Sequence, residues 1–240
     1  MRIALTALAA LAVAIAPARG QASAAQGAIQ PSDRFEPEIQ AFEAADRIHP
    51  PAKGGIVVVG SSSIRLWETL AADFPGAAVI NRGFGGSQLS DAVRFAPRIV
   101  LPYRPRLIVL YAGDNDLAEG KSPDQILRDY RAFVRLVRRR LPQTRIAFIS
   151  VKPSPARRAL AAQARRTNRL VRQYSSGDRR LRYVDVYTPM LDASGSPRPE
   201  LFQADSLHMT AAGYAIWRDW LTPVVAAPPP GTRAQGVARP

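Results

Sequence analysis

The feature that most constrains the fold is a regular alternation of short apolar runs with longer amphipathic segments. Five runs are short, apolar and rich in β-branched residues, which is typical of buried strands. They span residues 56–59, 77–80, 106–111, 146–150 and 182–186. Segments with helical spacing separate them, so the sequence predicts an α/β fold with a five-stranded parallel sheet covered on both faces. Ligands of such sheets bind beyond the carboxyl ends of the strands, where the strand order reverses.

The helix signals are clearest after the third run. Ser122 is placed to cap a helix, Pro123 takes its first position and Gln125 completes a capping box. An apolar stripe then continues to Leu141, and Pro142 ends the helix. Further helices are expected at 37–47, from 64, from 89 with Ser87 as the cap, at 156–174, and at 211–221 with Thr210 as the cap.

The amino-terminal segment 1–24 has the pattern of a secretory signal peptide. Arg2 supplies a positive charge, residues 3–17 are apolar and alanine-rich, and Ala22-Ser23-Ala24 matches an A-x-A cleavage site. About fifteen apolar residues are too few to cross a bilayer. We therefore expect an exported protein, periplasmic or secreted, with no transmembrane segment after signal removal.

The remaining chain is expected to hold one domain. Residues 25–54 should form a lead-in, mobile up to residue 35, followed by a helix, and 55–222 should form the α/β domain. Residues 223–240 are rich in proline, alanine and glycine, which predicts a disordered tail.

The chain is strongly basic, with 33 Lys and Arg against 19 Asp and Glu and a net charge of +14. This charge fits contact with nucleic acid or with anionic envelope components, and it also fits solvated helix faces. We favour solvated faces and expect no nucleic-acid partner, because no basic motif interleaved with aromatic residues appears. Weak contact with anionic envelope components stays an alternative. The absence of cysteine excludes disulfides and thiolate chemistry.

Small and polar residues follow three of the predicted strands. Ser61-Ser62-Ser63 forms a strand-to-helix turn, where a hydroxyl would be exposed near the positive end of a helix dipole. A loop containing Gly85-Gly86 follows the second strand, and Asn115 lies in a polar cluster after the third. The glycine-rich loop matches neither dinucleotide nor Walker patterns, and the polar cluster lacks the spacing of a calcium loop.

The histidines are only two, His49 and His208. His49 precedes two prolines in a loop and is expected to be a surface residue. Asp205 lies three residues before His208, a spacing that lets the carboxylate reach Nδ1–H and leaves Nε2 free for Ser62. A serine nucleophile needs such a base, an orienting carboxylate and donors for the oxyanion. A metal site is not expected, because only one of the two histidines lies at the predicted site and no further clustered ligands are visible.

The order Ser62, Gly86, Asn115, Asp205, His208 resembles the four sequence blocks of the SGNH (GDSL-type) hydrolases, over roughly residues 55–220. The resemblance implies a flavodoxin-like three-layer sandwich and a catalytic triad of Ser62, Asp205 and His208. It implies an oxyanion hole made by the backbone N–H groups of Ser62 and Gly86 and the Asn115 side chain, with no cofactor. Ser61 replaces the family's aspartate, so Ser61 and Ser63 compete with Ser62 for assignment as the nucleophile.

The function expected on this basis is an exported serine hydrolase that cleaves small-molecule, lipid or glycan esters through an acyl-enzyme intermediate. One alternative is an O-acetylesterase or acetyltransferase acting on envelope polysaccharide. A second is a non-catalytic basic module that binds the envelope. Substrate specificity is expected to come from the loops at 151–157 and 187–204.

Overall fold

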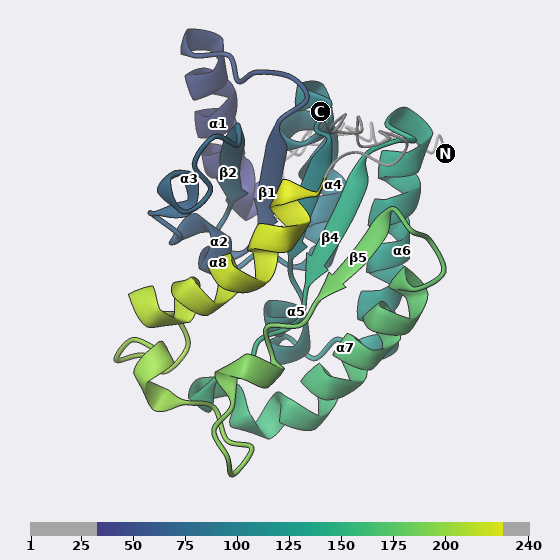
Figure 1. Cartoon of the computed structure of the whole chain (residues 1–240). Coiled ribbons are helices and arrows are strands. Elements are labelled where there is room, and N and C mark those ends of the chain that lie inside the picture. The colour runs from purple at the N-terminus through teal and green to yellow at the C-terminus, as the bar shows by residue number, and fades with distance from the viewer. Residues whose placement is uncertain (1–32, 228–240) are drawn as a thin grey trace, which may run out of the picture.

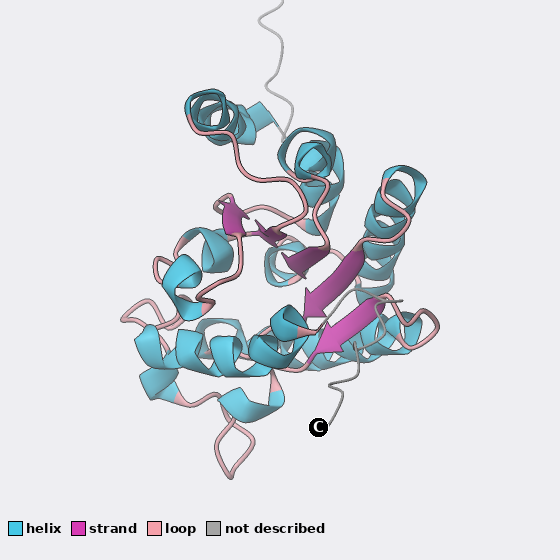
Figure 2. Cartoon of the chain, turned by 45° about the horizontal axis from the view of Figure 1, so that its top comes forward, coloured by secondary structure: helices cyan, strands magenta, loops and turns pink. Residues whose placement is uncertain are grey.

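The computed structural model describes residues 33–227, which form a three-layer α/β sandwich (Figures 1 and 2). A short 3-10 turn at Asp33–Phe35 precedes the first helix. The strands are β1 (Ile56–Gly60), β2 (Val79–Gly83), β3 (Leu107–Tyr111), β4 (Arg145–Ile149) and β5 (Leu181–Val184). The helices are α1 (Glu36–Ile48), α2 (Ser62–Arg65), α3 (Leu70–Asp73), α4 (Leu89–Ile99), α5 (Asp114–Ala118), α6 (Pro123–Arg140), α7 (Ala161–Ser175) and α8 (Ala211–Ala226).

The five strands form one parallel sheet in the order β2-β1-β3-β4-β5. This confirms the predicted five-stranded parallel sheet. From β1 the chain moves outward to β2, then returns to the other side of β1 to form β3. The order therefore reverses between β1 and β3, and a ligand site is expected where these two strands end.

Each face of the sheet packs against its own layer of helices, as Figure 2 shows with the strands seen obliquely. In β1, Val57 and Val59 belong to the core under α1, α4, α6 and α7. Ile56 and Val58 belong to the opposite core under α2, α3 and α8. Trp67 is central to that second core, where its ring packs against Phe74, Tyr214 and Trp217. The alternation follows from the two-residue period of a strand.

Several element boundaries differ from the prediction. β2 spans Val79–Gly83, so Asn81 lies in the strand rather than in the loop. β5 ends at Val184. The helix predicted at 156–174 begins as a 3-10 segment, Pro155–Leu160, and becomes α-helical only at Ala161.

The helix caps were predicted with mixed success. Ser122 and Gln125 form the expected capping box of α6, and Thr210 caps α8. The prediction for α4 was wrong: Gln88 occupies the cap position and its N–H donates to the Asp91 carboxylate at 2.8 Å. The hydroxyl of Ser87 is buried and has no hydrogen-bond partner in the described part of the chain.

Both ends of the predicted domain need correction. Phe35 is buried against Phe84 and Phe95, so the ordered structure begins before the end of the predicted mobile lead-in. The predicted disordered tail at 223–240 was wrong for its first residues, because α8 continues through Pro223 to Ala226 and buries Val224. The predicted signal peptide (1–24) and the rest of the tail, from 228, lie outside the described residues. Among residues 33–227, no helix is long and apolar enough to span a bilayer.

Candidate active site

Of the three serines in the turn after β1, only Ser62 is exposed to solvent in part. A Cβ at Gly60 would lie 2.0 Å from the carbonyl oxygen of Tyr111, so a glycine is needed where β1 closely approaches β3. Ser62 is the first residue of α2 and is partly exposed, whereas Ser61 and Ser63 are buried. The Ser61 hydroxyl has no hydrogen-bond partner among the described residues.

The loop before α8 brings a base to Ser62. His208 Nε2 lies 2.9 Å from Ser62 Oγ, although 146 positions separate the two residues in the chain. His208 Nδ1 lies 2.5 Å from the Asp205 carboxylate. The structure therefore aligns a hydroxyl, an imidazole and a carboxylate in one hydrogen-bonded line.

Asp205 is fixed by the backbone of its own loop. Its Oδ1 accepts the N–H groups of Leu207 and His208, each at 2.9 Å, while its Oδ2 faces the imidazole. Ser206 between them adopts a left-handed conformation with φ of 58°, which closes this tight turn. The Leu207 N–H and then the His208 side chain lower the pKa of Asp205 to about 2. The carboxylate is therefore ionised at neutral pH and can hold Nδ1–H toward itself.

Two backbone donors lie in the turns after β1 and β2. Within the described chain, the N–H groups of Ser62 and Gly86 have no protein acceptor. Gly86 has φ of +77°, a conformation that favours glycine. Free N–H groups at the carboxyl edge of a sheet are suitable for binding a developing negative charge.

The Asn115 side chain lies against the glycine-rich loop. Its Nδ2 donates to the Ser87 carbonyl oxygen at 3.1 Å, which leaves the second N–H of the amide for a ligand. No hydrogen bond links Gly86 or Asn115 directly to Ser62 in residues 33–227. The structure thus joins Ser62, His208 and Asp205 by contact, and places Gly86 and Asn115 at the neighbouring strand ends.

Sequence reasoning missed the charged residues behind Asn115. The buried Lys152 ammonium pairs with the Asp114 carboxylate at 3.0 Å. Burial opposes ionisation of Asp114, but Lys152 and Arg157 together leave its pKa below the usual value. Arg157 donates to the Asp114 carbonyl at 3.0 Å and to Asn115 Oδ1 at 3.4 Å. The sequence did contain a signal for this pair: Lys152 is one of only three lysines and closely follows the predicted strand at 146–150.

A second carboxylate supports the glycine-rich loop. Asp116 is fully buried and accepts the Leu89 N–H at 3.1 Å, which ties the start of α4 to α5. Lys121 contacts the same carboxylate at 3.2 Å. Burial raises the pKa of Asp116 to about 6 despite these partners.

The nucleophile turn is held from both sides. The Asn81 side chain in β2 donates to the Ile64 carbonyl at 2.7 Å and accepts the Gly83 N–H at 2.8 Å. The Tyr214 hydroxyl in α8 donates to the Ser63 carbonyl at 2.9 Å. These bonds anchor α2 to an edge strand and to the helix that follows the histidine loop.

His49 and the remaining acidic residues form no second candidate centre. His49 is exposed at the end of α1, as expected of a surface residue. Across residues 33–227, no group of three His, Asp or Glu side chains is arranged to hold a metal ion.

A parallel α/β sandwich of this order, with these residues at the ends of β1 and β3 and before the last helix, defines the class of SGNH hydrolases. The model of the GDSL-like Lipase/Acylhydrolase family matches residues 58–216. The chain belongs to this family, whose members are hydrolases acting on esters.

Individual proteins of known sequence or structure resemble the chain. The platelet-activating factor acetylhydrolase IB subunit alpha1 of Bos taurus is 26% identical over 168 residues, covering 66% of this chain and 69% of that protein. A Streptococcus pneumonia protein described as a candidate platelet activating factor has a TM-score of 0.72 at 20% identity, covering 80% and 93% of the two chains. An acetylxylan esterase of Geobacillus stearothermophilus has a TM-score of 0.60 at 14% identity, covering 74% and 96%. The two structures show the shared fold.

Proposed function

We propose that the protein is a serine esterase that hydrolyses carboxylic esters through an acyl-enzyme intermediate. The observation that carries this proposal is the line from Ser62 Oγ through the His208 imidazole to the Asp205 carboxylate. A serine hydroxyl is a weak nucleophile until a neighbouring base takes its proton. His208 lies at hydrogen-bond distance for that transfer.

In the first step, Ser62 Oγ attacks the ester carbonyl carbon while its proton passes to His208 Nε2. Asp205 stabilises the imidazolium through Nδ1–H. The carbonyl oxygen becomes an oxyanion, for which the N–H groups of Ser62 and Gly86 and the free Asn115 N–H are the donors. His208 then gives the proton to the departing alcohol, and the acyl group stays on Ser62.

In the second step, His208 takes a proton from water, which attacks the acyl-serine. The carboxylic acid leaves, and the proton returns to Ser62 Oγ. The names of the similar proteins include an acetylhydrolase and an acetylxylan esterase. Acetyl esters are therefore the first substrates to test, and transfer to sugar hydroxyls is the competing outcome of the second step.

The test is labelling with a fluorophosphonate, followed by peptide mapping. We expect the label on Ser62, and we expect its loss together with esterase activity in Ser62→Ala. Ser61→Ala and Ser63→Ala are matched controls, because both remove a neighbouring hydroxyl that does not contact His208, and both should retain labelling. Equal labelling of Ser62→Ala and wild type would contradict the proposal.

We also propose that the protein is exported, on the pattern of residues 1–24. Expression of the full chain with a carboxyl-terminal tag should give a mature protein that lacks these residues, outside the cytoplasm. Mass spectrometry of the purified protein measures the cleavage position. An intact amino terminus on cytoplasmic protein would contradict export.

A further inference from the structure

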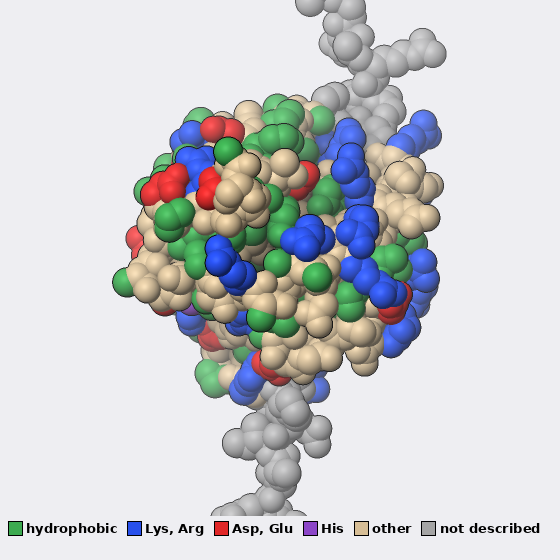
Figure 3. Space-filling view, turned by 90° about the horizontal axis from the view of Figure 1, so that it is seen from below, with side chains coloured by type: hydrophobic (Ala, Val, Ile, Leu, Met, Phe, Trp, Pro, Cys, Tyr) green, Lys and Arg blue, Asp and Glu red, His purple; other side chains and the backbone are tan. Residues whose placement is uncertain are grey.

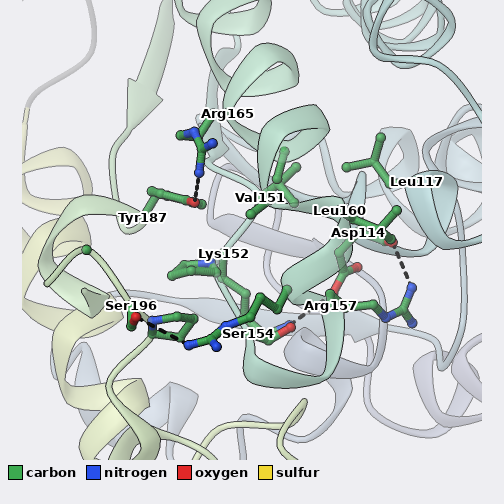
Figure 4. Close-up of a pocket in the computed structure, with 16 residues that line it drawn as sticks. Asp114, Leu117, Val151, Lys152, Ser154, Arg157, Leu160, Arg165, Tyr187 and Ser196 are labelled. Carbon is green, nitrogen blue, oxygen red and sulfur yellow. Dashed lines mark hydrogen bonds and ion pairs between the residues drawn. The ribbon is translucent and has the colours of Figure 1, made fainter. Parts of the chain in front are cut away.

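A cavity of about 210 Å³ adjoins the residues around Asn115. It lies between the ends of β3 and β4, the 3-10 segment Pro155–Leu160, the start of α7 and the loop at 187–197 (Figure 4). Part of its wall is apolar, formed by Leu117, Val151 and Leu160. Its volume corresponds to several water molecules at about 30 Å³ each, which suits a small chemical group.

Another part of the wall is cationic. The side chains of Arg157, Arg158 and Arg165 line the cavity, and none of them forms an ion pair with a carboxylate of residues 33–227. Arg158 is held by the Ser196 hydroxyl at 3.3 Å and Arg165 by the Tyr187 hydroxyl at 3.4 Å. Figure 4 shows the contact between Arg165 and Tyr187. Figure 3 shows several Lys and Arg side chains on the face toward which the strand arrows of Figure 1 point.

The other charged residues at the cavity do not neutralise the positive charge of the three arginines. Lys152 and Asp114 both line it, but they pair with each other and cancel. The other Asp114 oxygen is buried without a hydrogen-bond partner among the described residues. The cavity therefore has a net charge of three guanidinium groups, with the amino-terminal end of α7 adding the positive end of its dipole.

Two hydrogen bonds link residues at the cavity to the candidate active site. Arg157 lines the cavity and also donates to Asn115 Oδ1, whose amide is a proposed oxyanion donor. The N–H of Ala156, beside it, donates to the carbonyl of Ser206 in the loop that carries Asp205 and His208. Arg157 therefore belongs both to the wall of the cavity and to the surroundings of the Asn115 amide.

We propose that this cavity is a subsite for an anionic group, a carboxylate or a phosphate, carried by the ester substrate on a short apolar segment. The inference rests on the proposed esterase function and names its substrate class. Guanidinium groups bind both anions through paired N–H donors, and the apolar wall would contact the segment that carries the anion. Esters with such an anion should be turned over more efficiently than matched neutral esters.

The test compares kcat/KM for matched pairs of aryl esters, followed by the absorbance of the released phenol. On the acyl side, the pair is the para-nitrophenyl monoester of glutaric acid and para-nitrophenyl valerate. On the alcohol side, para-acetoxybenzoate and para-acetoxyphenyl phosphate are each compared with phenyl acetate. We expect at least one anionic member to exceed its neutral partner by about tenfold or more. The pair that shows this preference identifies whether the anion is on the acyl or the alcohol part of the ester, and whether it is a carboxylate or a phosphate.

The variant Arg158→Gln with Arg165→Gln should remove most of that preference and leave neutral-ester kcat/KM unchanged. Neither residue contacts Ser62, His208 or Asn115 in the structure. The control is Arg166→Gln with Arg169→Gln, which removes two exposed charges from α7 outside the cavity, the first of them paired with Asp124, and should keep the preference. No preference in the wild type, or an equal preference in both double variants, would overturn the proposal.

A binding experiment separates this proposal from the esterase proposal. Calorimetric titration of Ser62→Ala with glutarate and with inorganic phosphate should show binding that Arg158→Gln with Arg165→Gln weakens by about tenfold. If the protein binds these anions but the wild type hydrolyses no ester, the esterase proposal is refuted and the anion subsite is not. Active hydrolysis of neutral esters without anion binding or preference would refute the subsite alone.

Discussion

Asn115 has two fixed hydrogen bonds that set the orientation of its amide. Its Oδ1 accepts from Arg157 and its Nδ2 donates to the Ser87 carbonyl. Because both ends of the amide are engaged, the free N–H has one available direction. An oxyanion donor works best when it is oriented before the reaction begins.

Asn115→Ala should lower kcat by about 10²–10³-fold with little change in KM, because the lost hydrogen bond strengthens mainly in the transition state. Steady-state kinetics with an acetyl ester measure this. Fluorophosphonate labelling at Ser62 should slow in parallel, and the melting temperature should stay near that of the wild type. Wild-type kcat in Asn115→Ala would remove the residue from the proposed mechanism.

The sequence predicted well which residues come together at the site. It predicted less well how their individual side chains are oriented. Asp205 and His208 could be paired from their three-residue spacing, because a local turn determines their contact. Ser62 was favoured over Ser61 and Ser63 only through the family resemblance, because which hydroxyl is exposed depends on the angle at which α2 leaves the sheet. Arg157 was missed because its contact with Asn115 joins segments 42 positions apart.

At the scale of elements, Asp116 links α5 to the start of α4 and so holds the loop that contains Gly86. Its pKa is raised to about 6 by burial, from an ordinary value of 3.8. Between these pH values, the native protein keeps a proton that the unfolded chain releases. This residue therefore lowers the free energy of unfolding as pH rises from about 4 to about 6, by about 3 kcal/mol at most.

Asp116→Asn should remove that pH-dependent part, because an amide does not titrate. Relative to the wild type, the free energy of unfolding of the variant should rise by about 1–3 kcal/mol between pH 4 and pH 7. Urea denaturation at several pH values measures the difference. Asp129→Asn removes the other carboxylate in contact with Lys121 and controls for that contact. Parallel pH profiles for wild type and Asp116→Asn would contradict the assigned effect.

Strand positions were predicted well where the strands are buried on both faces, as in β1, β3 and β4. The boundaries of the edge strands β2 and β5 differ from the prediction by one to three residues. β2 pairs only with β1, and its later residues include Asn81 and Arg82, whose polarity resembles that of a loop. Hydrophobicity alone cannot locate the end of a strand whose polar side chains have partners in other elements.

At the scale of the whole molecule, the carboxyl-terminal limit of the domain lies beyond the predicted 222. Val224 and Val225 are buried in the core under α8. The Arg145 guanidinium in β4 donates to the carbonyl oxygens of Val224 at 2.9 Å and of Ala227 at 2.7 Å. The last turn of α8 therefore connects to the central sheet.

A chain ending at Thr222 should be destabilised by about 3 kcal/mol, since each buried valine contributes about 1.5 kcal/mol or more. For a domain of this size, that corresponds to a fall in melting temperature of about 6–12 °C. A chain ending at Ala227 is the matched control and should melt close to the full chain. Equal melting temperatures for the two truncated chains would show that the last turn adds no stability.

The long separation between Ser62 and His208 has a consequence for synthesis. During translation, Ser62 leaves the ribosome well before His208 and before α8, which follows it in the chain. A nascent or carboxyl-terminally degraded chain consequently has an inert serine. Under the proposed mechanism, esterase activity would arise only in chains synthesised through His208 and the helix that follows it.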